Sequence, residues 1–231
     1  MTNADLPNRI HVLAKPTGST CNLNCDYCFY LKKEGLYPGS RFRMSDEVLE
    51  AYLSQLIAAH RTDTVAVAWQ GGEPTLMGLD FFRRAVALQE THRRPGMRFE
   101  NTLQTNGTLL TEEEWCALPA GRTISSWESA STGPTPRCHD AHRRGQKRGR
   151  PTFDRVMRGL RLLQRHGVET NVLGHRSTRS PTPQSPLAIY RFCATRAAPV
   201  SAGSSSFRRS NGCRRGWSVP TRKGRASRRA A

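Results

Sequence analysis

The stretch Cys21-Asn22-Leu23-Asn24-Cys25-Asp26-Tyr27-Cys28 places three cysteines within eight residues. Their spacing is C-x3-C-x2-C, and an aromatic residue precedes the third cysteine. Cysteine thiolates are the usual ligands of iron–sulfur clusters. Three thiolates hold three corners of a small cluster and leave one iron open to a small molecule. This loop is therefore the first candidate site of the chain.

On either side of this loop, short apolar runs alternate with amphipathic stretches. We expect strands over 9–14, 64–69, 97–103 and 168–173, and helices over 45–57, 79–92, 151–167 and from Thr111. Ser45 and Thr152 have the chemistry of helix N-caps. Such alternation predicts an α/β fold with a parallel sheet and right-handed crossovers.

Three loops of unusual composition follow the expected strands, namely 21–28, 71–74 and 104–107. In barrels built from β/α units, the C-terminal ends of the strands share one face, and chemistry collects there. The shared placement of the loops is stronger evidence for one active site than any single motif.

The net charge of +18 is unevenly distributed. Residues 1–116 have a net charge of −2, residues 117–231 have +20, and no Asp or Glu follows Gly174. The sequence after this point is rich in Ser, Arg, Pro and Gly and has no core pattern. A basic half of this kind is compatible with a nucleic-acid-binding protein. We do not favour that function, because aromatic side chains are sparse there and no binding module is recognisable.

Seven cysteines with three of them clustered do not make a disulfide framework. Clustered thiols persist best in a reducing cytosol. Because the sequence contains neither a long apolar run nor a secretory leader, we expect a cytoplasmic protein with no membrane partner. The alternative for the motif is a structural zinc site. Its fourth ligand would be Cys116 or His139, which are candidates by sequence distance only.

In its wider context the motif resembles a known family. Cys21–Cys28 looks like the cluster motif of radical S-adenosylmethionine (SAM) enzymes. The runs 15–30, 69–76 and 103–109 are similar to anaerobic sulfatase-maturating enzymes, which belong to the SPASM-containing subfamily. The resemblance implies a [4Fe-4S] cluster and SAM as cofactors. It also implies an incomplete, partial (β/α)6 TIM-like radical SAM barrel.

The same resemblance implies an oxidoreductase that generates a 5′-deoxyadenosyl radical and oxidises a Cys or Ser of a sulfatase to formylglycine. The expected partners are a sulfatase or other peptide substrate and a one-electron reductant protein. Two related alternatives stay open. In the first, the chain is another peptide-modifying radical SAM maturase. In the second, it is the non-functional, aggregation-prone product of a disrupted gene.

Carried over residue by residue, the resemblance assigns three groups of side chains and no catalytic one. Cys21, Cys25 and Cys28 would bind the cluster. A second group would bind SAM: Tyr27, Gly71, Gly72, Glu73 and Arg143. In this group Tyr27 would pack on the adenine, and the glycines would let a backbone edge approach the amino group of SAM. The substrate peptide would face Tyr30, Gln70 and Gln104. Taken alone, Gly71–Pro74 also fits an ordinary turn.

The chain departs from the family after Leu118. A Ser-Leu-Asp-Gly-type strand is expected near position 129, where the sequence is Trp127–Gly133, and the auxiliary-cluster region with its proton-accepting aspartate is absent. We expect a core over 1–173, native-like over 9–118 and 151–173 and irregular over 119–150, followed by a basic tail over 174–231. The segments 119–138, 143–150, 174–186 and 193–231 resemble a related gene read out of frame. The chain is therefore expected to be an impaired fragment.

Overall fold

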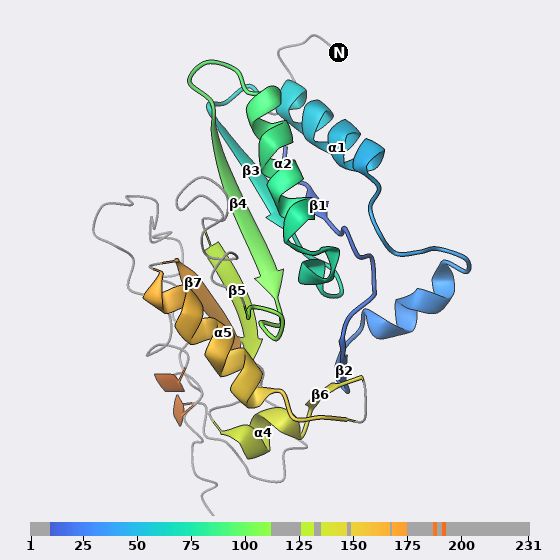
Figure 1. Ribbon diagram of the computed structural model, residues 1–231, viewed down its shortest axis with the longest axis vertical. Helices are drawn as coiled ribbons and strands as arrows, with labels where there is room; N and C mark the ends of the chain where they lie inside the picture. The colour runs from blue at the N-terminus through green and yellow to red at the C-terminus, as the bar shows by residue number, and fades with distance from the viewer. Residues whose placement is uncertain are drawn as a thin grey trace, which may run out of the picture. The chain divides into compact units, whose positions relative to one another are not determined.

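The computed structural model describes residues 10–111, 126–131, 135–146, 149–166, 168–174, 187–188 and 191–192, with the backbone alone for 126–131 and 173–174. All of these residues belong to one compact unit, Met1–Pro199 (Figure 1). None of the helices in this part of the chain is both long and apolar enough to cross a membrane.

Five parallel strands form the main sheet, in the order β1-β3-β4-β5-β7. They are β1 (Leu13–Ala14), β3 (Thr64–Trp69), β4 (Arg98–Thr105), β5 (Ser126–Ser131) and β7 (Thr170–Gly174). The strands are ordered as they occur in the chain, as in an opened β/α barrel. The expected partial barrel is confirmed.

Helices connect these strands. The longer ones are α1 (Asp46–Ala59), α2 (Leu79–Thr91) and α5 (Phe153–Arg165). Short elements lie between them: the 3-10 helices η1 (Leu31–Leu36) and η2 (Pro74–Met77), the helix α4 (Pro136–Asp140), and the strands β2 (Leu23–Cys25) and β6 (Arg143–Gly145). Figure 1 shows β2, β6 and α4 beyond the arrowheads of the main sheet, at the C-terminal ends of its strands.

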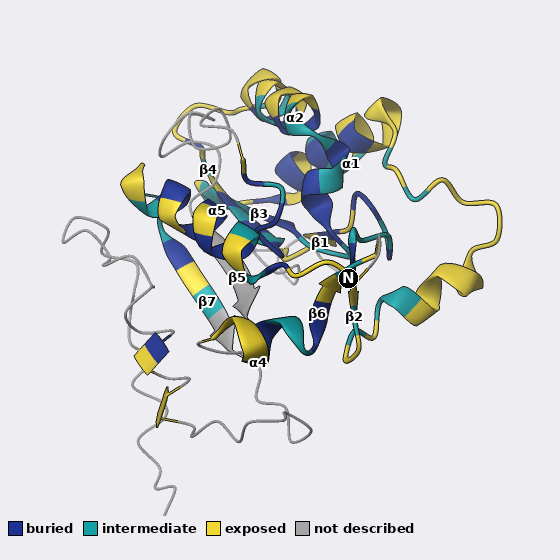
Figure 2. Cartoon of the chain, turned by 60° about the horizontal axis from the view of Figure 1, so that its bottom comes forward, coloured by how far each residue is buried: buried dark blue, intermediate teal, exposed yellow. Residues whose placement is uncertain are grey.

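The hydrophobic core lies between the sheet and the three longer helices. Trp69, the last residue of β3, meets the rings of Tyr52, Phe81 and Phe82 edge-on, at centroid distances of 5.9, 5.8 and 5.8 Å. Its indole N–H donates to Asn101 Oδ1 at 3.1 Å. Leu162 and Leu163 of α5 belong to the same cluster, and Figure 2 shows buried positions on the sides of α1, α2 and α5 that face the sheet. Trp69 thereby fixes the point from which the Gln70–Pro74 loop begins.

The expected helix starts are partly correct. Ser45 caps α1, and its hydroxyl accepts from the Val48 N–H at 3.3 Å. Thr152 precedes α5 but does not cap it with its side chain. Instead, Asp140 Oδ1 accepts from the N–H groups of Thr152 and Phe153 at 2.7 and 3.0 Å. Thr152 thus occupies the expected N-cap position, but the capping oxygen belongs to Asp140 of α4, which sequence spacing does not show.

Three elements fall in the segment 119–150, which we expected to be irregular. β5 pairs with β4 and β7, α4 caps α5, and β6 pairs with β2. Backbone pairing explains β5, because ladder hydrogen bonds use main-chain groups that every residue except proline has. The first strand is shorter than expected, and the helix expected from Thr111 lies almost wholly outside the described residues.

Candidate functional site

The cysteine motif is anchored to a distant part of the chain. Its strand β2 pairs antiparallel with β6, so that Cys25 lies opposite Arg143. The Asp26 N–H donates to the carbonyl of His142 at 3.2 Å, and the Asp26 carboxylate lies 2.7 Å from Nδ1 of the His142 ring. The pairing therefore brings Arg143 to the motif, although more than 110 residues separate them in the sequence.

The three thiols of the motif are free and half-buried. Cys21 Sγ accepts from the Leu23 N–H at 3.3 Å and from Asn106 Nδ2 at 3.6 Å. Burial nevertheless raises the pKa of Cys21 to about 11 and also raises the pKa of Cys25. In the absence of a metal these two thiols hold their protons at neutral pH, so metal binding must release them.

Tyr27 and Arg143 form a pair beside the motif. Burial raises the pKa of the Tyr27 hydroxyl to about 12, against the opposing effects of the Arg143 charge and a hydrogen bond with its guanidinium. The same cation lowers the pKa of Cys25 against the effect of burial. Arg143 is almost fully buried, whereas 39% of Tyr27 is exposed. The ring of Tyr27 therefore remains accessible to a ligand, as packing on an adenine requires.

Gly71 and Gly72 are glycines for a reason that the sequence did not show. A Cβ on Gly72 would lie 2.0 Å from the carbonyl oxygen of Thr20. Gly71 has φ +129, and a Cβ there would lie 2.8 Å from the carbonyl oxygen of Gly18. The Gly72 N–H donates to that same Gly18 oxygen at 2.8 Å. The close approach that demands glycine is thus to the turn between β1 and the cysteine loop.

Glu73 is fully buried, and its carboxylate accepts hydrogen bonds from neighbouring protein groups. Oε1 accepts from the N–H and hydroxyl of Thr75 and from the hydroxyl of Thr105, and Oε2 accepts from the N–H of Asn106. Burial raises the pKa of Glu73, and the hydrogen bonds oppose this rise. A side chain so enclosed has no surface for SAM. We therefore reassign Glu73 from a cofactor contact to a positioning residue that joins two loops.

Asn22, Asn106 and Thr108 are functional candidates that the residue-by-residue assignment missed. Asn106 Nδ2 donates to Asn22 Oδ1 at 2.8 Å, Asn22 Nδ2 donates to the Thr108 hydroxyl at 2.9 Å, and the Thr108 N–H donates to Asn106 Oδ1 at 3.0 Å. This closed network joins the cysteine loop to the loop after β4. Asn106 could have been identified from the sequence, because it belongs to the loop 104–107, which follows an expected strand.

The three residues expected to face a substrate lie together. The Tyr30 hydroxyl donates to Gln70 Oε1 at 3.4 Å, and Gln70 Nε2 donates to Gln104 Oε1. Tyr30 and Gln70 lie in two loops, Gln104 lies at the C-terminal end of β4, and all three are on the C-terminal side of the sheet. The structure thus shows the expected grouping, while their contact with a substrate stays a prediction.

The zinc alternative has no arrangement of ligands in the part of the chain that the structure describes. No three His, Cys, Asp or Glu side chains among these residues are placed to share one metal ion, and this includes Cys21, Cys25 and Cys28. An iron–sulfur cluster does not require that placement, because each of its cysteine ligands binds a different iron atom. His139 lies in the core with Nε2 3.1 Å from the Thr152 hydroxyl. Cys116 lies outside the described residues.

Comparison with known proteins then identifies the family. The family model described as the radical SAM superfamily matches residues 16–178. The chain belongs to the radical SAM superfamily. It is 37% identical over 192 residues to a serine-type anaerobic sulfatase-maturating enzyme of Bacteroides thetaiotaomicron, a match that covers 83% of this chain and 45% of the relative. A cysteine-type enzyme of Clostridium perfringens is 35% identical over 172 residues, with 71% and 43% covered.

A solved structure of native anSMEcpe with bound AdoMet and Cp18Cys peptide superimposes with a TM-score of 0.61 at 35% identity. The match covers 70% of this chain and 41% of that chain. This radical SAM chain therefore spans less than half the length of the curated relatives it matches.

Radical SAM enzymes use a [4Fe-4S] cluster and AdoMet. The cysteine loop fits a cluster: three free thiols lie on one loop, two hydrogen-bond donors point at Cys21 Sγ, and the Arg143 cation lies beside Cys25. Hydrogen bonds to sulfur and nearby positive charge both stabilise thiolate ligands. Cys21, Cys25 and Cys28 would therefore hold the cluster, and Tyr27, Arg143 and the backbone around Gly71 and Gly72 would lie next to AdoMet.

Proposed function

We propose that this chain is the cofactor-binding part of a peptide-modifying radical SAM enzyme of the sulfatase-maturating type, which oxidises a Cys or Ser of a sulfatase to formylglycine. One observation carries the proposal. The loops after β1, β3 and β4 are bonded to one another around the three cysteines, through Gly72 to Gly18, Glu73 to Asn106, and Asn106 to Cys21.

When bound, the cluster and AdoMet would supply a 5′-deoxyadenosyl radical able to take a hydrogen atom from a peptide side chain. The protein residues would place that side chain and exclude water. Gln70 and Gln104, held together by their own hydrogen bond and by Tyr30, present amide groups suited to a peptide backbone. The buried Glu73–Asn106 network keeps these loops in register with the cysteine motif.

The similarity to sulfatase-maturating enzymes favours this substrate class over those of other radical SAM maturases. The serine-type and cysteine-type relatives share similar identity with this chain, so either residue is a candidate substrate. The proposal includes a one-electron reductant protein as a partner. It also places the chain in the cytoplasm, because clustered free thiols need a reducing compartment. Since the family's fourth-strand serine motif has no counterpart in the sequence, we expect the chain by itself to turn over slowly.

Anaerobic reconstitution with iron and sulfide tests the cluster. We expect an absorbance band at about 400 nm, which is typical of such clusters. This band should disappear in Cys21→Ala, Cys25→Ala and Cys28→Ala. Cys138→Ala is the matched control, because Cys138 lies outside the motif and is buried in α4. An absorbance that survives loss of the motif cysteines would contradict the assignment.

The substrate is tested by incubating the reconstituted chain with AdoMet, dithionite and peptides that differ only in Cys, Ser or Ala at one position. Mass spectrometry should detect formylglycine from the Cys or Ser peptide and none from the Ala peptide. AdoMet cleavage without any peptide product would support a different radical SAM reaction, and rapid conversion would contradict the expected impairment.

A further inference from the structure

A cavity of about 570 Å³ opens beside Tyr30, outside the cysteine loop. It lies where the segment before the cysteines, η1 and the start of α1 meet. None of the three motif cysteines lines it. Its volume is in the range of sites that enclose small organic ligands.

The cavity has a basic wall without a countercharge. Lys15, Lys33 and Arg43 line it, and no Asp or Glu does. Arg43 donates to the carbonyl oxygens of Leu76 and Met77. The two lysines have no ion pair within the described part of the chain, and a cleft lined by one sign of charge attracts the opposite ion.

Both ammonium groups lie beside the ring of Tyr30. Lys15 Nζ lies 5.1 Å and Lys33 Nζ 5.7 Å from the centre of this ring, and Lys33 Nζ lies 4.8 Å from the centre of the Phe29 ring. Each contact with a ring is weakly favourable, but like charges that line one cavity repel each other. An anion bound in the cavity would reduce this repulsion.

A buried hydroxyl adds a directional donor. Ser19 lines the cavity and is 94% buried, at 6% exposure, and its Oγ has no hydrogen-bond partner among the described residues. A buried polar group without a partner is costly. A carboxylate would accept this hydroxyl's hydrogen bond and remove that cost.

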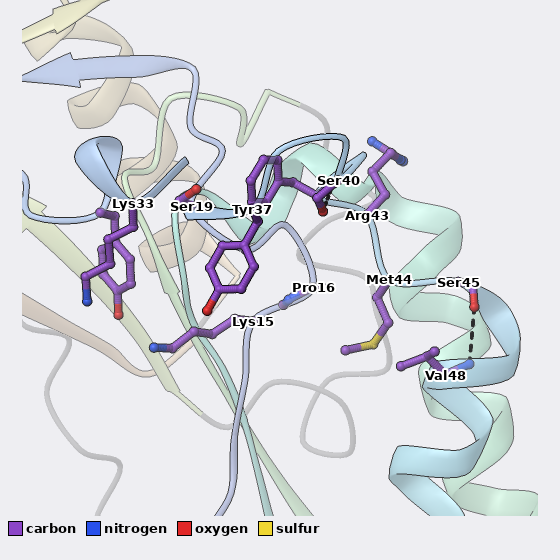
Figure 3. Close-up of a pocket in the computed structure, with 13 residues that line it drawn as sticks. Lys15, Pro16, Ser19, Lys33, Tyr37, Ser40, Arg43, Met44, Ser45 and Val48 are labelled. Atoms are coloured by element: carbon purple, nitrogen blue, oxygen red, sulfur yellow. Dashed lines mark hydrogen bonds between the residues drawn. The ribbon is translucent and has the colours of Figure 1, made fainter. Parts of the chain in front are cut away.

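Two apolar side chains line the opposite end of the cavity. Figure 3 shows Lys15, Lys33 and Ser19 on one side of the view, and Met44 and Val48 on the other, where Arg43 and Ser45 also lie. Val48 is an exposed apolar side chain on α1. A ligand that satisfies both ends has a carboxylate head and an apolar body.

We propose that this cavity binds a carboxylate attached to an apolar group, and that its source is an acidic residue of the peptide substrate. Tyr30 belongs both to the cavity and to the Tyr30–Gln70–Gln104 group. A peptide lying on that group therefore reaches the cavity with a neighbouring side chain. The choice of a peptide rests on the proposed function, whereas the carboxylate site does not.

The site is tested on the full chain by calorimetry with 3-phenylpropionate and its neutral amide, without iron or AdoMet. We expect the acid to bind at least about tenfold more tightly, in line with charge-assisted hydrogen bonds. Lys15→Met/Lys33→Met should reduce this preference to less than about twofold. Lys32→Met is the control, because Lys32 is an exposed neighbour that does not line the cavity, and it should keep the preference.

Salt provides a test that needs no variant. Raising the ionic strength should weaken binding of the acid and leave the amide unchanged, because exposed charges are screened. Equal binding of acid and amide, or a preference that persists in the double variant, would overturn the site.

The source is tested with two labelled hexapeptides that contain one Cys and differ only in Glu or Gln beside it. Tighter binding of the Glu peptide, lost in the double variant, supports a peptide source. Equal binding of the two peptides, with the free acid still preferred over its amide, would overturn the peptide source and point to a small carboxylate. Neither readout depends on formylglycine formation, so failure of the proposed function is seen separately.

Discussion

Gly72 shows at the scale of one residue how the cysteine loop is held. Its missing Cβ lets the backbone of the Gly71–Pro74 loop lie against Thr20. We expect Gly72→Ala to lower the free energy of unfolding by at least about 2 kcal/mol, since backbone atoms cannot move aside as a flexible side chain does. Urea unfolding measures this.

Gly35→Ala is the control for that change. A Cβ at Gly35 meets nothing within 4 Å, and its φ is not in the left-handed region. This substitution should change stability by less than about 0.5 kcal/mol. Equal effects of the two substitutions would show that the contact between the loops is not tight.

His139 gives the fold a pH dependence. Burial, assisted by the Arg143 charge, lowers its pKa from 6.5 to about 3. At pH values between about 3 and 6.5, His139 binds a proton in the unfolded chain but not in the folded chain. The free energy of unfolding therefore decreases as the pH falls below about 6.5. The loss from this one group is at most about 1.4 kcal/mol per pH unit.

His139→Gln isolates this effect, because an amide can also donate to the Thr152 hydroxyl. We expect the free energy of unfolding of the variant to depend less steeply on pH between 4.5 and 6.5 than that of the parent chain. Parallel pH profiles for the two proteins would mean that His139 is protonated in the fold.

At the scale of elements, α5 depends on α4 for its start. Asp140 accepts from the N–H groups of Thr152, which precedes α5, and of Phe153, its first residue. This is the role of an N-cap supplied from outside the helix. Asp140→Ala should cost about 1 kcal/mol, and up to about 2 kcal/mol, of stability. Asp154→Ala is the comparison, since Asp154 is exposed in the first turn of the same helix and can act only through the helix dipole. Its cost in urea unfolding should be smaller, and an equal cost would assign the effect to charge alone.

At the scale of the whole molecule, β1 lies at one end of the sheet, and among the described strands it pairs with β3 alone. Ile10, Val12 and Leu13 are apolar and more than one-third exposed there. An uncovered apolar edge favours association between chains. We expect Leu13→Lys to raise the concentration at which light scattering begins.

Ala58→Lys adds the same charge on the exposed side of α1 and serves as its control. If both substitutions raise the scattering threshold equally, net charge and not the edge governs solubility.

The change in charge along the chain is also a property of the whole molecule. We propose that a gene read out of frame accounts for both the balance of +20 after residue 116 and the missing fourth-strand motif. We expect the nucleotide sequence around codons 115–200 to contain single-base insertions or deletions relative to related genes. An intact reading frame would contradict this origin.

Much of the fold was predictable from local patterns. The strand over 64–69, the helix capped by Ser45 and the placement of three loops on one face follow from residue period and cap chemistry. The cap that Asp140 supplies to α5 and the strand β5 were not predictable, because a cap from another helix and a backbone ladder leave no periodic pattern in the sequence.

The sequence by itself determined the lineage and the thiol loop, because the ligand spacing of Cys21–Cys28 is a local property. Only the tertiary structure decided what Gly72, Glu73 and Asn106 do. Gly72 makes room for backbone from another loop, Glu73 is enclosed by donors from two loops, and Asn106 reaches a cysteine 85 positions away. These roles depend on distances between segments, which the folding of the sheet sets.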